Sequence, residues 1–241
     1  MIFYYVRHGD PIYNPDSLTE KGKKQANALA KRLSLYGLDE IYCSTSERAK
    51  MTAKPTADAL KKEVIYLDWT NEHYTWLALC VFNEKNERQW AFSRDEFIEM
   101  FRREDVKRLG NKWYTHECFN DCGVDFKTEF ERIDSETDNF FENLGYKHDR
   151  ENNRFIEIKK NDKRVALFAH LGFGLAFLSS LLDIPYSTFS STFSISHSCV
   201  TVIEFKANKN GIVYPKVLQL SNDSHLYKED ILGGYDNGIN I

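Results

Sequence analysis

The sequence lacks any long uninterrupted apolar run. No stretch approaches the roughly 20 apolar residues that a transmembrane helix needs. The N-terminus also lacks a basic segment ahead of an apolar run, which a secretory signal peptide would have. There are no internal repeats. We therefore expect a cytoplasmic protein that does not work on a membrane.

Positive charge and paired cysteines are also lacking. Lys and Arg number 32 against 36 Asp and Glu, a formal net charge of −4, so neither nucleic acid nor acidic membrane is expected as a partner. The five cysteines are odd in number and irregularly spaced, which argues against a disulfide framework. His116, Cys118 and Cys122 form a loose cluster without a clear fourth metal ligand. The sequence therefore predicts neither a metal nor another cofactor.

The length and composition are those of an ordinary soluble globular protein. The chain has 241 residues, of which 42% are hydrophobic and 28% charged. This suffices for one large α/β domain, or for one domain that carries an insertion. We expect a single domain over residues 1–241.

The first strand is expected over residues 2–6, an apolar run rich in aromatic and β-branched residues. Arg7, His8 and Gly9 follow it directly. A guanidinium offers a planar fork of donors for phosphate or carboxylate, and an imidazole can act as nucleophile or base near neutral pH. Glycine lets the backbone turn sharply and approach a ligand closely. The tripeptide alone is weak evidence, so the rest of the chain has to support it.

Two helices and two further strands are expected in the first third of the chain. A polar turn at residues 16–18 precedes a helix that Ser17 or Thr19 can cap and that ends at Tyr36–Gly37. A strand over residues 40–43 leads into a serine-rich turn and a second helix, in which Pro55 conflicts with the helical pattern. A third strand is expected over residues 64–67.

Residues 68–153 differ in composition from the rest of the chain and are predicted to form an inserted, mainly helical cap. All four tryptophans fall here, and helices are expected near residues 94–108 and 127–144. The tryptophans can stack on an organic substrate, but core packing is the favoured interpretation for most of them.

The last third of the chain predicts strands over residues 155–158, 165–169, 198–205 and 212–218, and an irregular tail from Gly233. An almost wholly apolar helix begins at His170 and ends before Pro185. His73, His116, His148, His197 and His225 match no chemical motif and are interpreted as structural or exposed.

Several polar residues are predicted at the carboxyl ends of strands. Arg7 with His8, Arg48, and His170 all lie there or just beyond. In an open α/β sheet such positions converge on one ligand site. Two arginines and two histidines at one point would make a strong anion site. Asp68 and Glu72 add a carboxylate after the third strand.

With these residues in place, the sequence resembles the histidine phosphatase superfamily, the phosphoglycerate mutase-like proteins. The matching segments occur in the family's order: RHG at 7–9, Asn14, LTEKGKKQA at 18–26, STSERAKMTA at 44–53, NEHY at 71–74 and AHLGFG at 169–174. Leu171 stands where the family usually has glycine, and the segment around Glu72 matches loosely. The expected fold is a three-layer αβα sandwich with a mostly parallel central sheet and the inserted cap.

The resemblance implies a metal-independent phosphomonoesterase that acts on a phosphorylated small molecule. His8 would attack phosphorus and become a phosphohistidine. The groups that hold the phosphoryl oxygens would be Arg7, Arg48 and His170. Glu72 would be the general acid, with Asp68 as the alternative. Asn14 and Leu171 are the expected substrate-binding positions.

Two other functions stay open at this stage. One is a phosphoglycerate-type mutase, although only residues 10–18 separate Gly9 from Thr19, which favours hydrolysis. The other is a catalytically inactive protein that binds a phosphorylated ligand. The sequence names neither the substrate nor the oligomeric state.

Overall fold

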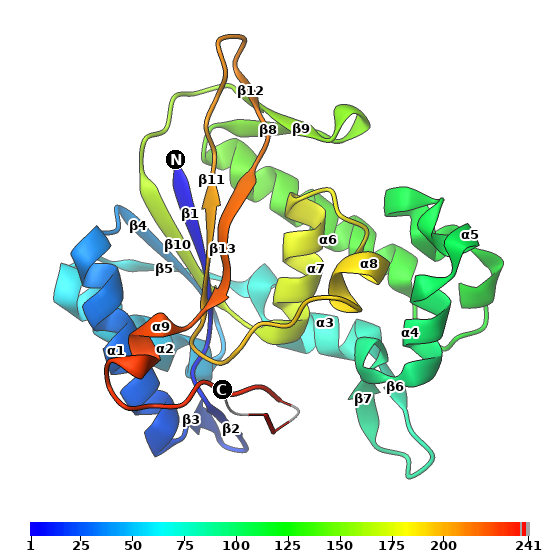
Figure 1. Ribbon diagram of the computed structural model, residues 1–241, viewed down its shortest axis with the longest axis horizontal. Helices are drawn as coiled ribbons and strands as arrows, with labels where there is room; N and C mark the ends of the chain where they lie inside the picture. The colour runs from blue at the N-terminus through cyan, green and yellow to red at the C-terminus, as the bar shows by residue number, and fades with distance from the viewer. Residues whose placement is uncertain (237, 240–241) are drawn as a thin grey trace.

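The computed structural model describes residues 1–236 and 238–239, and a six-stranded sheet forms its centre (Figure 1). Four neighbouring strands run parallel to one another. The two strands at the other side of the sheet are each antiparallel to their neighbours in the sheet. This is the predicted mostly parallel α/β sheet. In spatial order the strands are β13 (Lys216–Asn222), β11 (Val200–Glu204), β1 (Ile2–Arg7), β10 (Arg164–Ala169), β4 (Glu40–Ser44) and β5 (Val64–Leu67).

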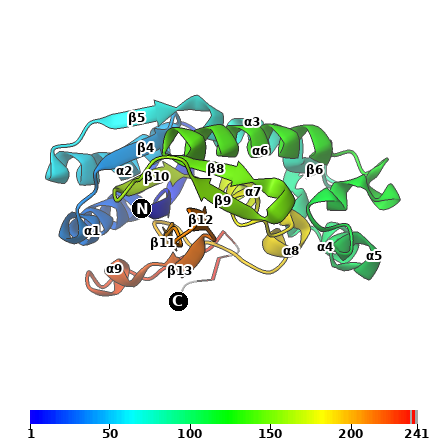
Figure 2. The same cartoon turned by 90° about the horizontal axis from the view of Figure 1, so that it is seen from above.

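Helices cover both faces of this sheet, as the two views show (Figures 1 and 2). α1 (Glu20–Tyr36) and α2 (Glu47–Leu60) lie on one face, and α6 (Phe126–Asn143) and α7 (Leu171–Leu181) lie on the other. The pleat of β1 explains this, because alternate side chains enter opposite cores. Tyr4 and Val6 join the core with α1 and α2, whereas Phe3 and Tyr5 join the core with α6 and α7. The predicted three-layer sandwich is confirmed.

The segment that follows Gly9 differs from the prediction. Residues 16–18 are not a polar turn but β3 (Asp16–Leu18), which pairs antiparallel with β2 (Pro11–Tyr13). Ser17 therefore lies within a strand, and Thr19 caps α1 by accepting a hydrogen bond from the Gly22 N–H. The expected stop at Gly37 is confirmed, since its φ of 71° is open mainly to glycine.

Helix α2 resolves the conflict at Pro55, because the helix runs through this residue. Ser46 caps its start by accepting from the Ala49 N–H, as the serine-rich turn suggested. A proline removes one backbone donor, but helices in proteins are held mainly by their packed face. That face is buried here through Ala49, Thr52, Ala53, Thr56 and Ala57.

The region 68–153 contains helices, one hairpin and the strand β8 (Tyr146–Asp149). Its first part comprises η1 (Asp68–Thr70), α3 (Glu72–Leu79), the pair β6 (Cys80–Phe82) and β7 (Arg88–Trp90), and η2 (Ala91–Ser93). The helix expected near 94–108 is divided, because Arg103 is extended between α4 (Asp95–Arg102) and α5 (Glu104–Lys107). Short turns η3 (Gly110–Thr115) and η4 (Glu117–Phe119) lead to α6, which matches the helix expected near 127–144.

A second sheet of three strands corrects the C-terminal prediction. β9 (Arg154–Glu157) lies between β8 (Tyr146–Asp149) and β12 (Ile212–Val213), away from the central sheet. The strand expected over 212–218 is therefore two strands, since β13 begins only at Lys216. The elements that remain are η5 (Arg150–Asn152), α8 (Tyr186–Ser190) and α9 (Ser224–Tyr227).

Within the tail expected to be irregular, residues 233–236 and 238–239 lie in no helix or strand, and residues 237 and 240–241 lie outside the described part. Among the helices described, none combines the length and the apolarity that crossing a membrane requires.

Candidate active site

Arg7 and His8 stand at the carboxyl end of β1, in the middle of the central sheet. Both side chains are 1% exposed. The backbone of His8 is held from two sides, because its N–H donates to the Ala169 carbonyl and its carbonyl accepts from the Ser198 N–H. The main chain therefore fixes His8 between β10 and the start of β11.

The imidazole of His8 is held in one tautomer. Its Nδ1 lies 2.7 Å from the carbonyl oxygen of Gly9. A carbonyl can only accept, so Nδ1 carries the proton and Nε2 keeps its lone pair. The turn needs glycine, because a Cβ on Gly9 would lie 2.8 Å from the Gly22 carbonyl oxygen at the start of α1. His8 thus presents a basic nitrogen from a rigid, closely packed loop.

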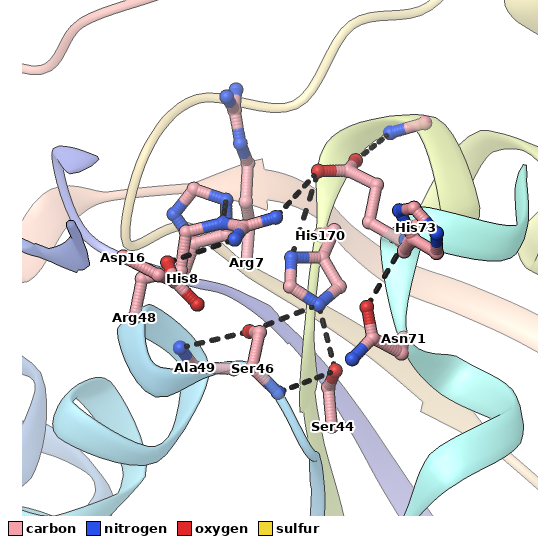
Figure 3. Close-up of polar contacts among 12 residues, drawn as sticks. Arg7, His8, Asp16, Ser44, Ser46, Arg48, Ala49, Asn71, His73 and His170 are labelled. Carbon is pink, nitrogen blue, oxygen red and sulfur yellow. Dashed lines mark hydrogen bonds and ion pairs between the residues drawn. The ribbon is translucent and has the colours of Figure 1, made fainter. Parts of the chain in front are cut away.

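Arg48, in the first turn of α2, lies beside this nitrogen. Its Nε is 3.3 Å from Nε2 of His8, and its terminal nitrogens bind Asp16 at 2.9 Å and Glu72 at 3.0 Å (Figure 3). Burial opposes the charge, but Glu72 and Asp16 raise the pKa of this guanidinium above its ordinary value. The side chain therefore supplies a fixed positive charge next to His8.

His170 follows β10, which is the parallel neighbour of β1, and its ring centroid lies 5.2 Å from that of His8. Nε2 of His170 is 2.8 Å from the Ser44 hydroxyl and 3.4 Å from the Ser46 hydroxyl (Figure 3). The other ring nitrogen, Nδ1, is buried without a hydrogen-bond partner among the described residues, 3.7 Å from a Glu72 oxygen. One buried nitrogen thus remains free to meet a ligand.

Glu72 begins α3, whose N-terminus is capped by the Asn71 side chain. One of its carboxylate oxygens accepts from the Gly172 N–H at 2.8 Å, and the other accepts from Arg48. Asp68, the alternative acid, is exposed and accepts from the Thr45 and Tyr74 hydroxyls. Of the two candidate acids, Glu72 is the one that binds Arg48 and lies next to His170.

Arg7 contacts two side chains that the sequence analysis did not place at the site, those of His197 and Asp236. Its guanidinium donates to the Ile195 carbonyl at 2.7 Å, to Nε2 of His197 at 2.8 Å and to the Asp236 carboxylate at 2.7 Å. The rings of His197 and His8 are 5.8 Å apart. Because β11 is antiparallel to β1, the residues before β11 lie at the same edge as the end of β1. A prediction that β11 pairs antiparallel with β1 would therefore have identified His197 as a site residue.

The buried histidines are held neutral. Burial, together with His170, Arg7 and Arg48, lowers the pKa of His8 well below its ordinary value. Burial, Arg48 and Arg7 do the same to the pKa of His170, and burial lowers the pKa of His197. An unprotonated imidazole is a nucleophile, so the lowered pKa suits His8 to attack an electrophile at neutral pH.

The same cluster contains three groups that could ligate a metal ion. Ligand atoms of His8, Glu72 and His170 lie within 4.8 Å of one another. However, Arg48 donates to both His8 and Glu72. Its guanidinium therefore already supplies the positive charge that a metal ion would bring to these ligand atoms. At the other cluster, His116 Nδ1 accepts from the Cys118 N–H and Nε2 lies 3.3 Å from Asp105. Neither donor set is arranged as a metal centre would need.

A cavity of about 950 Å³ opens over Arg48 and Glu72. Asn14 is exposed in the turn between β2 and β3, and its neighbours Tyr13 and Asp16 line the cavity in its place. The Leu171 side chain belongs to the core, so only its backbone N–H, in the first turn of α7, is left to bind a ligand. Both residues stay predictions as substrate contacts.

A mostly parallel sheet that gathers two histidines, two arginines and a carboxylate at its carboxyl edge defines an α/β protein with a site for an oxyanion. Residues 3–114 match the family model of the histidine phosphatase superfamily (branch 1). This match covers 112 of the 241 residues, so the N-terminal part of the chain is similar to that superfamily.

Individual relatives agree with this family. The chain is 39% identical over 87 residues to phosphoserine phosphatase 1 of Hydrogenobacter thermophilus, and the match covers 32% of this chain but only 41% of the relative. Phosphoserine phosphatase of Entamoeba histolytica, solved with phosphoserine, has a TM-score of 0.58 at 17% identity, covering 93% of this chain and 98% of that one. A mycobacterial glucosyl-3-phosphoglycerate phosphatase has a TM-score of 0.56 at 16% identity, covering 90% and 97%. At these identities the two structures show a shared fold.

Proposed function

We propose that this protein is a phosphomonoesterase that hydrolyses a phosphorylated small molecule through a phosphohistidine on His8. The observation that carries the proposal is the unprotonated Nε2 of His8, fixed by the Gly9 carbonyl and placed 3.3 Å from Arg48 Nε. A nucleophile beside fixed positive charge is what in-line attack on a phosphoryl group requires. The match to the histidine phosphatase model and the phosphatases among the relatives support it.

In the first step, Nε2 of His8 attacks phosphorus while the bond from phosphorus to the leaving oxygen breaks. Arg7, Arg48 and His170 hold the non-bridging oxygens and stabilise their charge. Glu72, protonated for this step, gives its proton to the leaving oxygen, which departs as an alcohol. The Leu171 N–H and the Asn14 amide are further proposed contacts.

In the second step, the Glu72 carboxylate takes a proton from water, and the oxygen of that water attacks phosphorus. The bond from phosphorus to Nε2 breaks, which releases inorganic phosphate and restores neutral His8. Glu72 ends this step protonated, ready for the next ester. We also propose that residues 1–241 form one domain, in which the insertion at 68–153 limits access to the site.

The test is His8→Ala in the full-length protein. Loss of at least a thousandfold in kcat, together with loss of the acid-labile, alkali-stable phosphoenzyme, is the expected result. His116→Gln replaces a histidine far along the insertion and should retain both. Turnover of an aryl phosphate by His8→Ala at a near-normal rate would overturn the mechanism. A phosphoenzyme that transfers its phosphoryl group to a second alcohol rather than to water would make the protein a mutase.

A further inference from the structure

One wall of the cavity is aromatic. Trp76 from α3 and Trp90 from β7 meet edge to face, with ring centroids 4.8 Å apart at 84°. Trp90 also stacks on Phe92, with centroids 5.3 Å apart. Both tryptophans line the cavity, and Tyr13 continues the lining on the side of Arg48, whose guanidinium lies 5.4 Å from the Tyr13 ring centroid.

This wall is joined to the catalytic group. A Cβ on Gly172 would lie 2.3 Å from a ring carbon of Trp90, so the indole packs directly on the first turn of α7. The Gly172 N–H is the donor that holds the proposed acid, Glu72. The indole of Trp90 is therefore held close to the proposed acid, and so close to the oxygen that this acid would protonate.

The charges around the cavity are unbalanced. Its lining contains the carboxylates of Asp16, Glu47, Glu72 and Asp236. Among the described lining residues, Arg48 is the one permanent cation, and its terminal nitrogens already bind Asp16 and Glu72. Arg7 beneath the cavity is likewise bound to Asp236. Once a phosphoryl group takes the two guanidinium groups, the permanently charged groups left in the described lining are carboxylates, and the other polar groups there are Thr45, Ser46, Asn71 and the His73 imidazole.

Resting on the proposed phosphatase activity, we propose that the substrate is a phosphomonoester whose leaving group carries a ring and no second anionic group. A flat ring gains contact with the tryptophans. A carboxylate on the leaving group would lie among carboxylates with no permanent cation to pair it, which opposes binding. Phosphorylated amino acids and phosphoglycerates are therefore poor substrates of this site.

Matched aryl phosphates test the charge. Phenyl phosphate, 4-carboxyphenyl phosphate and 4-(aminomethyl)phenyl phosphate share a ring and differ in the charge at its far end. We expect kcat/KM for the carboxylate to be at least tenfold below that for phenyl phosphate, and the value for the amine to equal or exceed it. Equal or higher kcat/KM for the carboxylate would overturn the inference.

Glu47→Lys tests the source of that selectivity. Glu47 lines the cavity at the start of α2, and its side chain is 55% exposed, so the change should not disturb the fold. We expect the preference for phenyl over 4-carboxyphenyl phosphate to shrink at least threefold. Glu20→Lys is the matched control, because Glu20 begins α1 in the same way, is exposed and does not line the cavity. An unchanged preference in Glu47→Lys, or an equal change in the control, would contradict the charge argument.

Trp76→Ala tests the ring. Its kcat/KM ratio of phenyl phosphate to glycerol 3-phosphate should fall at least fivefold. Leu77→Ala is the control on the same helix, since Leu77 is 50% exposed and does not line the cavity. An unaltered ratio in Trp76→Ala, with circular dichroism like that of the unmodified protein, would remove the aromatic part of the inference. If no ester in either panel forms a phosphohistidine on His8, the proposed function itself fails. Active turnover with phosphoserine preferred would refute this inference alone.

Discussion

Both carboxylate oxygens of Asp236 lie 2.7 Å from one terminal nitrogen of Arg7, although the two residues are 229 positions apart in the chain. Arg7 is buried and belongs to the proposed phosphoryl site, whereas Asp236 comes from the C-terminal tail and lines the cavity. Burial opposes the charge on Asp236, but its contacts with His197 and with the Arg7 guanidinium hold its pKa well below the ordinary value. The carboxylate is therefore ionised at neutral pH and occupies a donor that a phosphoryl oxygen needs.

Asp236→Asn should strengthen anion binding. An amide in place of the carboxylate no longer competes as an anion for Arg7, so inhibition by vanadate or phosphate should tighten about three- to tenfold. Inhibition constants measured at fixed pH and ionic strength check this. Asp230→Asn changes an exposed carboxylate in the same tail and should leave the constants unchanged. Weaker inhibition in Asp236→Asn would mean instead that the carboxylate positions Arg7.

The activity should survive chelation. Arg48 stands beside His8 and Glu72, where it supplies the positive charge that a divalent ion would otherwise bring. Dialysis against EDTA should change kcat by less than about twofold, and added Mg²⁺ or Zn²⁺ should not raise it. If chelation abolished turnover and one metal restored it, His8, Glu72 and His170 would have to be metal ligands.

The stability of the fold should fall in mild acid. Burial and Arg32 lower the pKa of His225 to about 3, so between pH 6.5 and that value the unfolded chain binds a proton that the folded chain does not. The free energy of unfolding therefore decreases as the pH falls through this window, by about 2 kcal/mol at pH 5 for this one group. The lowered pKa values of His8, His170 and His197 act in the same direction.

Urea unfolding from pH 8 to pH 5 measures this effect. In His225→Gln the loss of stability on acidification should be smaller by about 2 kcal/mol. His148 provides the opposite sign, because its hydrogen bonds to Asp138 and Asp183 raise its pKa against the effect of burial. His148 therefore stabilises the fold most at low pH, and His148→Gln should lose more stability at pH 5 than at pH 8. The same slope in all three proteins would contradict the role given to burial.

Four of the site residues could be found from the sequence because their placement is local. Arg7, His8, Arg48 and His170 each lie at the end of a strand or shortly after it, and the carboxyl ends of parallel strands meet at one edge. The central sheet and its covering helices were predictable for the same reason. Apolar runs predict buried strands and helical periodicity predicts amphipathic helices, and both patterns can be recognised within a short stretch of sequence.

The features that escaped prediction depend on long-range placement. The role of His197 follows from β11 lying beside β1, and that of Asp236 follows from the path of the tail. Asp16 binds Arg48 because β3 folds back on β2, whereas the residues 16–18 suggested only a turn. The split of the strand expected at 212–218 has a similar origin, because Ile212 and Val213 pair with β9 of another sheet.

The proton donor provides the last prediction. Glu72 touches the Gly172 N–H and Arg48 and lies 3.7 Å from His170, whereas Asp68 is exposed and binds the Thr45 and Tyr74 hydroxyls. An alkoxide is a poor leaving group and needs a proton, whereas a nitrophenolate leaves with little help. Glu72→Gln should therefore slow phosphorylation of His8 by an alkyl phosphate about a hundredfold or more, and slow phosphorylation by 4-nitrophenyl phosphate much less.

The second step makes this prediction sharper. Because the same carboxylate is proposed to activate water, Glu72→Gln should accumulate phosphohistidine when 4-nitrophenyl phosphate is the substrate. Single-turnover rates for both esters, with the phosphoenzyme quantified after an alkaline quench, separate the two steps. Asp68→Asn is the matched control and should behave like the unmodified protein with both esters. The opposite result would be a loss that depends on the leaving group in Asp68→Asn, with an equal and small loss for both esters in Glu72→Gln. That result would assign the proton to Asp68, because only removal of the acid makes the rate depend on how well the leaving group departs unprotonated.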